Sequence, residues 1–160
     1  MPESALKKAM DLLAARPLTE FELRKKLAAG GKFSDQEIGE ALDVCRSRGY
    51  LNDALLASDA AQFLNAGGRG RGMIRKKLRA RGVNEELLDE AMSALTPEAE
   101  AEAARSAASV KLRLLTREKD AGKKREKLFR FLISRGFSPE TAAGTVRELL
   151  RDLPEDAENF

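Results

Sequence analysis

The residues of this chain whose types and spacing best suit chemistry are its cations. The stretch GGRGRGMIRKKLRARG, residues 67–82, holds seven of the 29 Lys and Arg residues in sixteen positions, and no acid. Guanidinium and ammonium groups at this density are suited to binding phosphate. Three uses fit: a glycine-rich loop that cradles a phosphate, a basic helix along a nucleic-acid backbone, or a soluble connection between two helices.

Groups for catalysis or metal binding are scarce. The chain has no histidine, the usual acid or base at neutral pH and the commonest metal ligand. Its carboxylates are spread over predicted solvent faces, and we interpret the single Cys45 as a packed core thiol rather than a reactive one. We therefore expect no enzymatic activity, no cofactor and no metal. The lone cysteine and the lack of a long apolar segment also predict a soluble, cytoplasmic protein without a membrane span.

The charge is arranged in bands. Net charge is only +3, but residues 67–83 carry seven cations and no acid, and residues 111–138 carry ten cations and three acids. The segments 1–66, 84–110 and 139–160 are net acidic. Solubility alone is served by interspersed signs, so the two basic bands indicate a polyanionic partner. The alternative is a basic helix surface kept only for solubility.

Three stretches share one layout, which predicts an internal repeat. Each has an apolar residue followed four positions later by leucine, then a glycine, an apolar residue, a capping residue and a second apolar helix face. The apolar pairs are Leu23 and Leu27, Ile74 and Leu78, and Leu128 and Leu132; the glycines are Gly31, Gly82 and Gly136; the caps are Ser34, Asn84 and Ser138. Each layout predicts two helices joined by a short turn.

An amphipathic segment precedes each helix pair, which completes three-helix repeats. Its predicted buried residues are Leu6, Met10 and Leu13 in the first repeat, Leu56, Ala60, Phe63 and Leu64 in the second, and Ala99, Ala103, Ala107, Val110 and Leu114 in the third. We expect an all-α, elongated and curved tandem array of nine helices. The predicted repeats are 1–51, 52–95 and 96–152, followed by an acidic tail at 153–160.

On this map the cations recur on the middle helix of each repeat. Equivalent positions carry Lys25, Lys76 and Arg130. The predicted basic strip comprises Lys25, Lys26, Arg75, Lys76, Arg79, Lys123, Lys124, Arg125, Lys127 and Arg130, with Gly70 and Arg71 in the loop before the second of these helices. Such a strip suits the repeating charge of nucleic acid.

Two more specific motifs fit poorly. The loop at 67–72 follows no predicted strand and is not followed by Gly-Lys-Ser or Gly-Lys-Thr, so it only superficially resembles a nucleotide-binding loop. It is either a flexible joint whose backbone can approach phosphate or a plain linker. A helix-turn-helix protein that recognises a DNA sequence places its second helix in the major groove. The corresponding helices here, SDQEIGEALD and NEELLDEAM, are acidic and would be repelled by the phosphates.

Three segments resemble the signatures of the RecX family, regulators of the RecA recombinase: RGYLNDALLA (48–57), the run from Gly70 through IRKKLRARGV, and KKREKLFRFLISRGFS (123–138). The likeness covers essentially the whole chain. It differs at Asn52, Leu55, Leu56 and Arg71, where the family usually has Asp, Arg, Phe and Pro, and at Asn65, near a commonly basic position.

The resemblance implies a non-enzymatic protein that binds the RecA nucleoprotein filament and curbs its ATPase, strand exchange and extension. It implies weaker binding to single- and double-stranded DNA, and we expect a monomer. A general nucleic-acid-binding helical module remains the alternative, because it would need only the basic strip.

Overall fold

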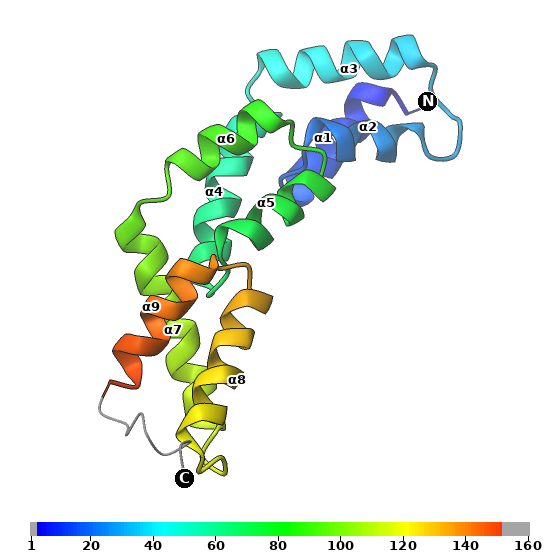
Figure 1. The fold of residues 1–160 in the computed structure, drawn as a ribbon. Coiled ribbons are helices and arrows are strands. Elements are labelled where there is room, and N and C mark those ends of the chain that lie inside the picture. The colour runs from blue at the N-terminus through cyan, green and yellow to red at the C-terminus, as the bar shows by residue number, and fades with distance from the viewer. Residues whose placement is uncertain (1–2, 152–160) are drawn as a thin grey trace. The chain divides into compact units, whose positions relative to one another are not determined.

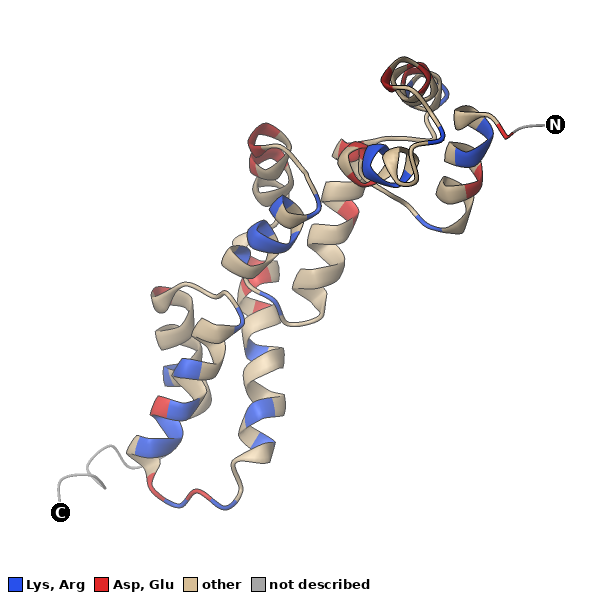
Figure 2. Ribbon diagram, turned by 90° about the vertical axis from the view of Figure 1, so that its right-hand side faces the viewer, with Lys and Arg blue, Asp and Glu red and all other residues tan. Residues whose placement is uncertain are grey.

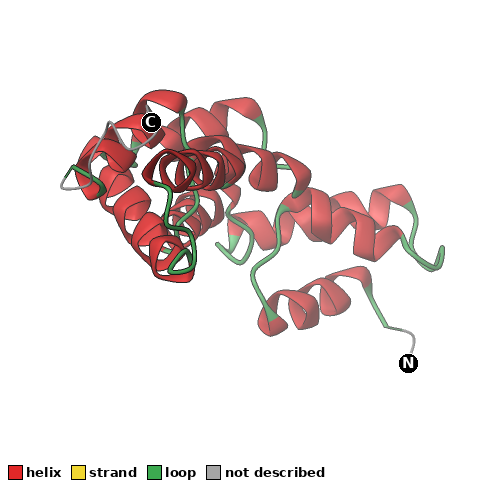
Figure 3. Cartoon of the chain, turned by 60° about the horizontal axis from the view of Figure 1, so that its bottom comes forward, coloured by secondary structure: helices red, strands yellow, loops and turns green. Residues whose placement is uncertain are grey.

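The structure is a computed structural model that describes residues 3–151. Over these residues the chain forms nine helices and no strand (Figures 1 and 3). The helices are α1 (Ala5–Ala15), α2 (Glu20–Ala28), α3 (Asp35–Ser47), α4 (Asp53–Ala66), α5 (Arg71–Ala80), α6 (Glu85–Ser93), α7 (Pro97–Leu114), α8 (Ala121–Ser134) and α9 (Pro139–Leu149). The predicted all-α class is confirmed. The predicted acidic tail at 153–160 lies outside the described residues.

The helices begin where the sequence provides capping side chains. The hydroxyl of Ser34 accepts a hydrogen bond from Glu37 N, and the Glu37 carboxylate accepts one from Ser34 N, so the predicted capping box is present. Thr19 and Glu22 form a second box at the start of α2. Asn84 and Ser138 accept from backbone amides three residues later, at 2.9 and 3.1 Å. Local sequence therefore fixes most of the helix starts.

The turns after α5 and α8 are alike. Gly82 and Gly136 adopt φ of +88° and +94°, the left-handed region in which glycine has no Cβ penalty. The next residue in each turn, Val83 or Phe137, donates its amide to the carbonyl five residues back, at 3.1 Å. Both of these apolar residues are buried. The common turn confirms that the second and third repeats share their predicted layout.

The described residues form two compact units. Unit 1 contains the chain up to Ala60 together with Lys77–Ala91, and unit 2 contains Ala61–Lys76 together with the chain from Met92 onward. In unit 1, α1 packs on α2 and α3 around a buried core. Its residues are Ala9, Leu18, Leu23, Leu27, Ile38, Leu42, Cys45 and Leu51. In unit 2, α7, α8 and α9 pack on one another around Ala103, Ala104, Ala108, Leu128, Leu132, Phe137, Ala142, Val146 and Leu150.

Each unit contains a joint in which an Arg-Gly turn docks on the start of an earlier helix. In unit 1 the Thr19 hydroxyl donates to Arg81 O at 2.5 Å, and the Arg81 guanidinium donates to the Glu22 carboxylate at 2.9 and 3.2 Å. In unit 2 Gly70 N donates to Arg135 O at 2.8 Å. Thr19 and Gly70 stand four residues before Leu23 and Ile74, the first apolar residues of the two equivalent helix pairs. The two joints thus lie at equivalent positions, but the first is made by side chains and the second by backbone atoms.

The glycine-rich loop at 67–72 packs closely against another backbone segment of unit 2. Gly72 N donates to Gly136 O at 3.0 Å, and a Cβ placed on Gly70 would lie 2.5 Å from the carbonyl carbon and oxygen of Gly136. Only glycine lets two backbones approach so closely. The loop therefore approaches the backbone of residues 135–137, whereas its predicted approach to a phosphate stays a prediction.

Three of the predicted buried faces are wrong in part. Val110 and Leu114 are exposed, and the core-facing alanines of α7 are Ala103, Ala104 and Ala108. An alanine-rich helix has little contrast between its faces, so the rotation about its axis is poorly defined by sequence. Phe63 in α4 is 79% exposed and Met10 in α1 is 37% exposed. Ala99 is also exposed.

Candidate nucleic-acid interface

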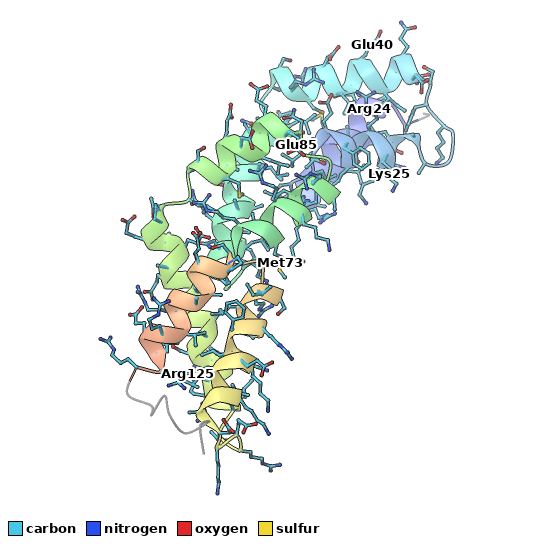
Figure 4. The ribbon with its side chains drawn as sticks, viewed as in Figure 1. Arg24, Lys25, Glu40, Met73, Glu85 and Arg125 are labelled. Atoms are coloured by element: carbon cyan, nitrogen blue, oxygen red, sulfur yellow. The ribbon has the colours of Figure 1, made fainter. Side chains whose placement is uncertain are left out.

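The cations at the recurring position are exposed in all three repeats. Lys25, Lys76 and Arg130 each lie two residues after a fully buried apolar residue, on α2, α5 and α8. Two residues correspond to about 200° around a helix, so burial of the first side chain turns the cation toward solvent. Lys25 and its neighbour Arg24 are labelled on α2 in Figure 4. The cation at the equivalent position of each repeat therefore lies on the solvent face of its helix.

The basic strip contains both unpaired and paired cations. Among residues 3–151, Lys25, Lys26, Lys76, Lys123 and Lys124 form no ion pair. An unpaired lysine can neutralise a phosphate without first losing a carboxylate partner. Arg75 and Arg125 are partly buried.

Three other members of the strip are held by acids. Arg79 donates to both carboxylate oxygens of Glu85, at 2.6 and 3.1 Å. Lys127 Nζ lies 2.8 Å from Glu118, and this hydrogen bond lowers the pKa of the Glu118 carboxyl. Arg130 lies 2.5 Å from Glu126. These exposed pairs are weak individually, so they orient the cations more than they neutralise them.

The loop residue Arg71 has partners within unit 2. Its guanidinium donates to the Glu100 carboxylate at 2.7 Å and to the carbonyls of Met92 and Leu95 at 2.7 and 2.6 Å. A phosphate at this arginine would have to replace those three partners. Gly70 likewise gives its amide to Arg135 O. Binding of phosphate by this loop therefore stays a prediction. The hydrogen bonds of Arg71 and Gly70 show directly that the loop holds parts of unit 2 together.

A basic groove between α7 and α8 includes residues that the sequence reasoning missed. Lys111, Lys127, Arg130, Phe131 and Ser134 line a hollow of about 350 Å³. Figure 2 shows Lys and Arg residues along α8 and on the C-terminal half of α7. Lys111 belongs to the same basic band as α8 in sequence, but only the packing of α7 on α8 brings it to Lys127 and Arg130.

The third helix of the first two repeats carries the opposite charge. Exposed acids on α3 include Glu40, labelled in Figure 4, and those on α6 include Glu86 and Glu90. A helix with this charge would be repelled by the phosphates that flank a DNA groove. The structure gives these helices the acidic surface that the sequence predicted.

The described residues offer little for other kinds of chemistry. No cluster of three His, Cys, Asp or Glu residues within 3–151 could hold a metal ion. Cys45 is fully buried, and burial raises the pKa of its thiol. No helix in the same range is long and apolar enough to cross a bilayer. The arrangement is suited to binding anions at helix surfaces.

These features define an all-α protein of tandem three-helix repeats with basic helix surfaces. Residues 5–45 match the sequence model of "RecX, first three-helix domain", and residues 98–143 match that of "RecX, third three-helix domain". The chain belongs to the RecX family.

Individual relatives support the same assignment over most of the chain. The "Regulatory protein RecX" of Pasteurella multocida is 33% identical over 91% of this chain and 88% of its own length. That of Chlorobaculum tepidum is 35% identical over 92% of this chain and 89% of its own length. The crystal structure of RecX from Lactobacillus salivarius covers 94% of this chain and 96% of its own, with a TM-score of 0.81 at 20% identity, which supports the fold.

Proposed function

We propose that this protein is a negative regulator of the RecA recombinase. It binds the RecA–DNA filament and inhibits its ATPase, strand exchange and extension, which restrains recombination and modulates DNA repair. The observation that carries the proposal is membership of the RecX family, whose curated members named above are regulatory proteins. The exposed cations at one position of all three repeats give the protein a means to bind a polyanionic assembly.

The repeats explain how modest contacts produce strong inhibition. A tandem protein that contacts several successive protomers converts each further contact into an intramolecular event, so weak contacts combine through effective concentration. The protein acts as a monomer in the cytoplasm, without a cofactor. Each cationic helix meets either DNA phosphate or an acidic surface of the recombinase.

Acidic helices provide selectivity for the filament. The exposed carboxylates of α3 and α6 disfavour approach to bare duplex DNA, whereas a filament offers protein surface beside the DNA. Binding to free single- or double-stranded DNA is therefore weaker than binding to the filament. A general nucleic-acid-binding module, the alternative function, would lack this preference.

The deciding experiment is a titration of this protein into RecA on single-stranded DNA while ATP hydrolysis is followed, at two salt concentrations. Affinity for the bare DNA is measured in parallel. Inhibition at concentrations too low to coat the DNA supports the regulator. Inhibition only in step with DNA coating supports the alternative.

A charge-reversal variant tests the cationic surface. Lys76→Glu, Arg79→Glu and Arg130→Glu together should abolish inhibition, because repulsion replaces attraction on α5 and α8. The matched control reverses Lys7, Lys8 and Lys32, three cations of unit 1 outside the basic strip. Both variants must retain the circular dichroism spectrum of the parent. Unchanged inhibition by the folded first variant would contradict the role of the strip.

A further inference from the structure

The end of α4 and the first half of α7 form a hollow that the proposed function does not use. Its volume is about 530 Å³, enough for a large aromatic side chain. All of its lining residues belong to unit 2, and none belongs to the basic strip. Four of them are alanines, whose methyl groups leave the space open to a bulky apolar group: Ala66, Ala94, Ala99 and Ala103.

Asn65 presents a polar atom to this hollow. The residue is only 4% exposed, and its Nδ2 donates to Arg69 O at 3.0 Å, which orients the amide. Among residues 3–151 no group donates to Asn65 Oδ1. This oxygen is still accessible, since the fully enclosed side-chain atoms without a partner in this range are Nε of Arg69 and Nε of Arg135. Because an unpaired buried acceptor is costly, Oδ1 favours a ligand that brings a hydrogen-bond donor into the hollow.

Large exposed apolar side chains continue the surface beyond the hollow. Phe63, which is 79% exposed, stands on α4 beside the lining residue Gln62. On α7, Val110 and Leu114 follow the lining residue Ser106 in steps of four, so they lie on the same side of the helix. They are 50% and 74% exposed. We call the hollow together with Phe63, Val110 and Leu114 the α4–α7 surface. Exposed apolar surface of this extent indicates contact with another macromolecule.

The charge around the hollow disfavours nucleic acid and cationic ligands. No cation lines the hollow, whereas Glu102 lines it with a side chain that is 69% exposed, and Glu98 is exposed one turn earlier. Phosphates would be repelled by these carboxylates. Glu102 is already held by Arg105 at 2.7 Å, so it is not a free partner for a basic side chain. The occupant that fits best is therefore a neutral, largely apolar group with an N–H donor.

We infer that the α4–α7 surface is a docking site for a protein partner that inserts a tryptophan side chain into the hollow. Tryptophan carries one N–H donor and no acceptor on an otherwise apolar ring, which matches an unpaired acceptor among alanine methyl groups. It is also enriched among the residues that dominate the energetics of protein interfaces. This chain contains no tryptophan, so a second copy cannot be the partner. The inference does not depend on the proposed action on RecA.

The first test titrates N-acetyl-tryptophanamide into the full chain. Because the protein has no tryptophan, the indole fluorescence comes from the probe alone. The same amide methylated at the indole nitrogen cannot donate to Asn65 Oδ1 and should bind about tenfold more weakly. Adenosine tests for a nucleic-acid base and should bind more weakly than the unmethylated amide. Equal affinities for the two amides, or tighter binding of adenosine, would overturn the inference.

A substitution that fills the hollow locates the probe. Ala99→Phe should weaken binding of N-acetyl-tryptophanamide about tenfold or more, because Ala99 is an exposed lining residue in the first turn of α7 and the new ring takes the place of the indole. The matched control is Ala54→Phe, at an exposed alanine in the first turn of α4 that belongs to unit 1. Parental affinity in a folded Ala99→Phe variant would show that the probe binds elsewhere. If that variant does not fold, the comparison of the two amides still decides.

A second probe distinguishes a protein segment from a small heterocycle. It is an alanine-based helical peptide of about twenty residues, with one tryptophan and leucines four and eight positions later on the same face. The peptide should bind more tightly than the amide. Val110→Gln with Leu114→Gln should weaken its binding about tenfold and leave binding of the amide unchanged, because only the peptide reaches beyond the hollow. A peptide that binds no more tightly than the amide would overturn the docking site.

Discussion

At the scale of single residues, an arginine in a glycine-rich loop has two possible roles, and only its partners distinguish them. Arg71 stands in the loop that looks most like a phosphate cradle, yet its guanidinium donates to Glu100 and to two backbone carbonyls at the end of α6 and just after it. Lys111 shows the reverse, since it belongs to a groove that the sequence did not predict. Composition identified the basic bands, but the roles of these two residues follow from the hydrogen bonds of Arg71 and from the packing around Lys111.

Glu22 and Arg81 form the polar part of the joint in unit 1. Burial raises the pKa of Glu22, but hydrogen bonds from Arg81 and from Thr19 N outweigh it, so the pKa is lowered. A carboxyl whose pKa is lower in the folded state stabilises the protein above the unfolded pKa, about 4.3, and this contribution is lost as pH falls through the folded pKa.

The variant Glu22→Gln should therefore be less stable than the parent near neutral pH, by about 1 kcal/mol, because hydrogen bonds to a charged group are stronger than those to an amide. The difference should shrink as pH falls below about 5 and disappear once the carboxyl is protonated. Urea denaturation at a series of pH values gives the free energies of unfolding. A difference that does not change with pH would show that the carboxylate charge has no part in the effect.

At the scale of elements, the Arg-Gly turns determine how helices are joined. The turn at Arg81 uses side chains, Thr19 and Glu22, whereas the turn at Arg135 uses backbone atoms of Gly70 and Gly72. The glycines of the loop at 67–72 are thus explained in part by the close approach of two chain segments. Their basic neighbours must be explained separately.

A pair of glycine substitutions tests this explanation. Gly70→Ala should destabilise the protein by about 2 kcal/mol or more, because the new Cβ would come within 2.5 Å of Gly136 and neither backbone can move freely. Gly39→Ala in α3 and Gly144→Ala in α9 should instead stabilise it by about 0.5 to 1 kcal/mol, since nothing lies within 4 Å of either added Cβ.

Thermal and urea unfolding of the three variants provide the comparison. If Gly70→Ala behaved like the two helical substitutions, the backbone contact at Gly136 would not contribute to stability. If Gly70→Ala keeps the helical content of the parent before unfolding, the joint is weakened. If the helical content changes, the joint is rearranged.

Sequence predicted the elements well where a local signal marked them. The caps at Ser34 and Ser138 and the turn glycines Gly82 and Gly136 lie where expected. The buried face of α7 was predicted incorrectly because its alanines are nearly equivalent. The joints could not be predicted because no pattern along the chain shows which distant backbone a glycine will contact. The exposure of the cations was predictable from the buried apolar residues two positions earlier, but their ion pairs were not.

At the scale of the whole molecule, the compact units do not coincide with the sequence repeats. The second repeat contributes to both units, with divisions after Ala60, Lys76 and Ala91. Consequently Lys25 lies in unit 1, whereas Lys76 and Arg130 lie in unit 2. A regulator that uses all three positions must engage its partner through both units.

This arrangement predicts how substitutions at the three positions combine. Lys25→Gln, Lys76→Gln and Arg130→Gln should each weaken binding to the RecA filament by about two- to fivefold, the range expected for exposed charges. If all three contact the filament together, their free energies should add, and the triple variant should weaken binding by the product of the single effects. Sedimentation with preformed filaments at fixed salt measures the affinities, with Lys8→Gln as the control. If one substitution accounted for the whole loss, a single repeat would carry the contact and the recurrence of the cation would reflect solubility alone.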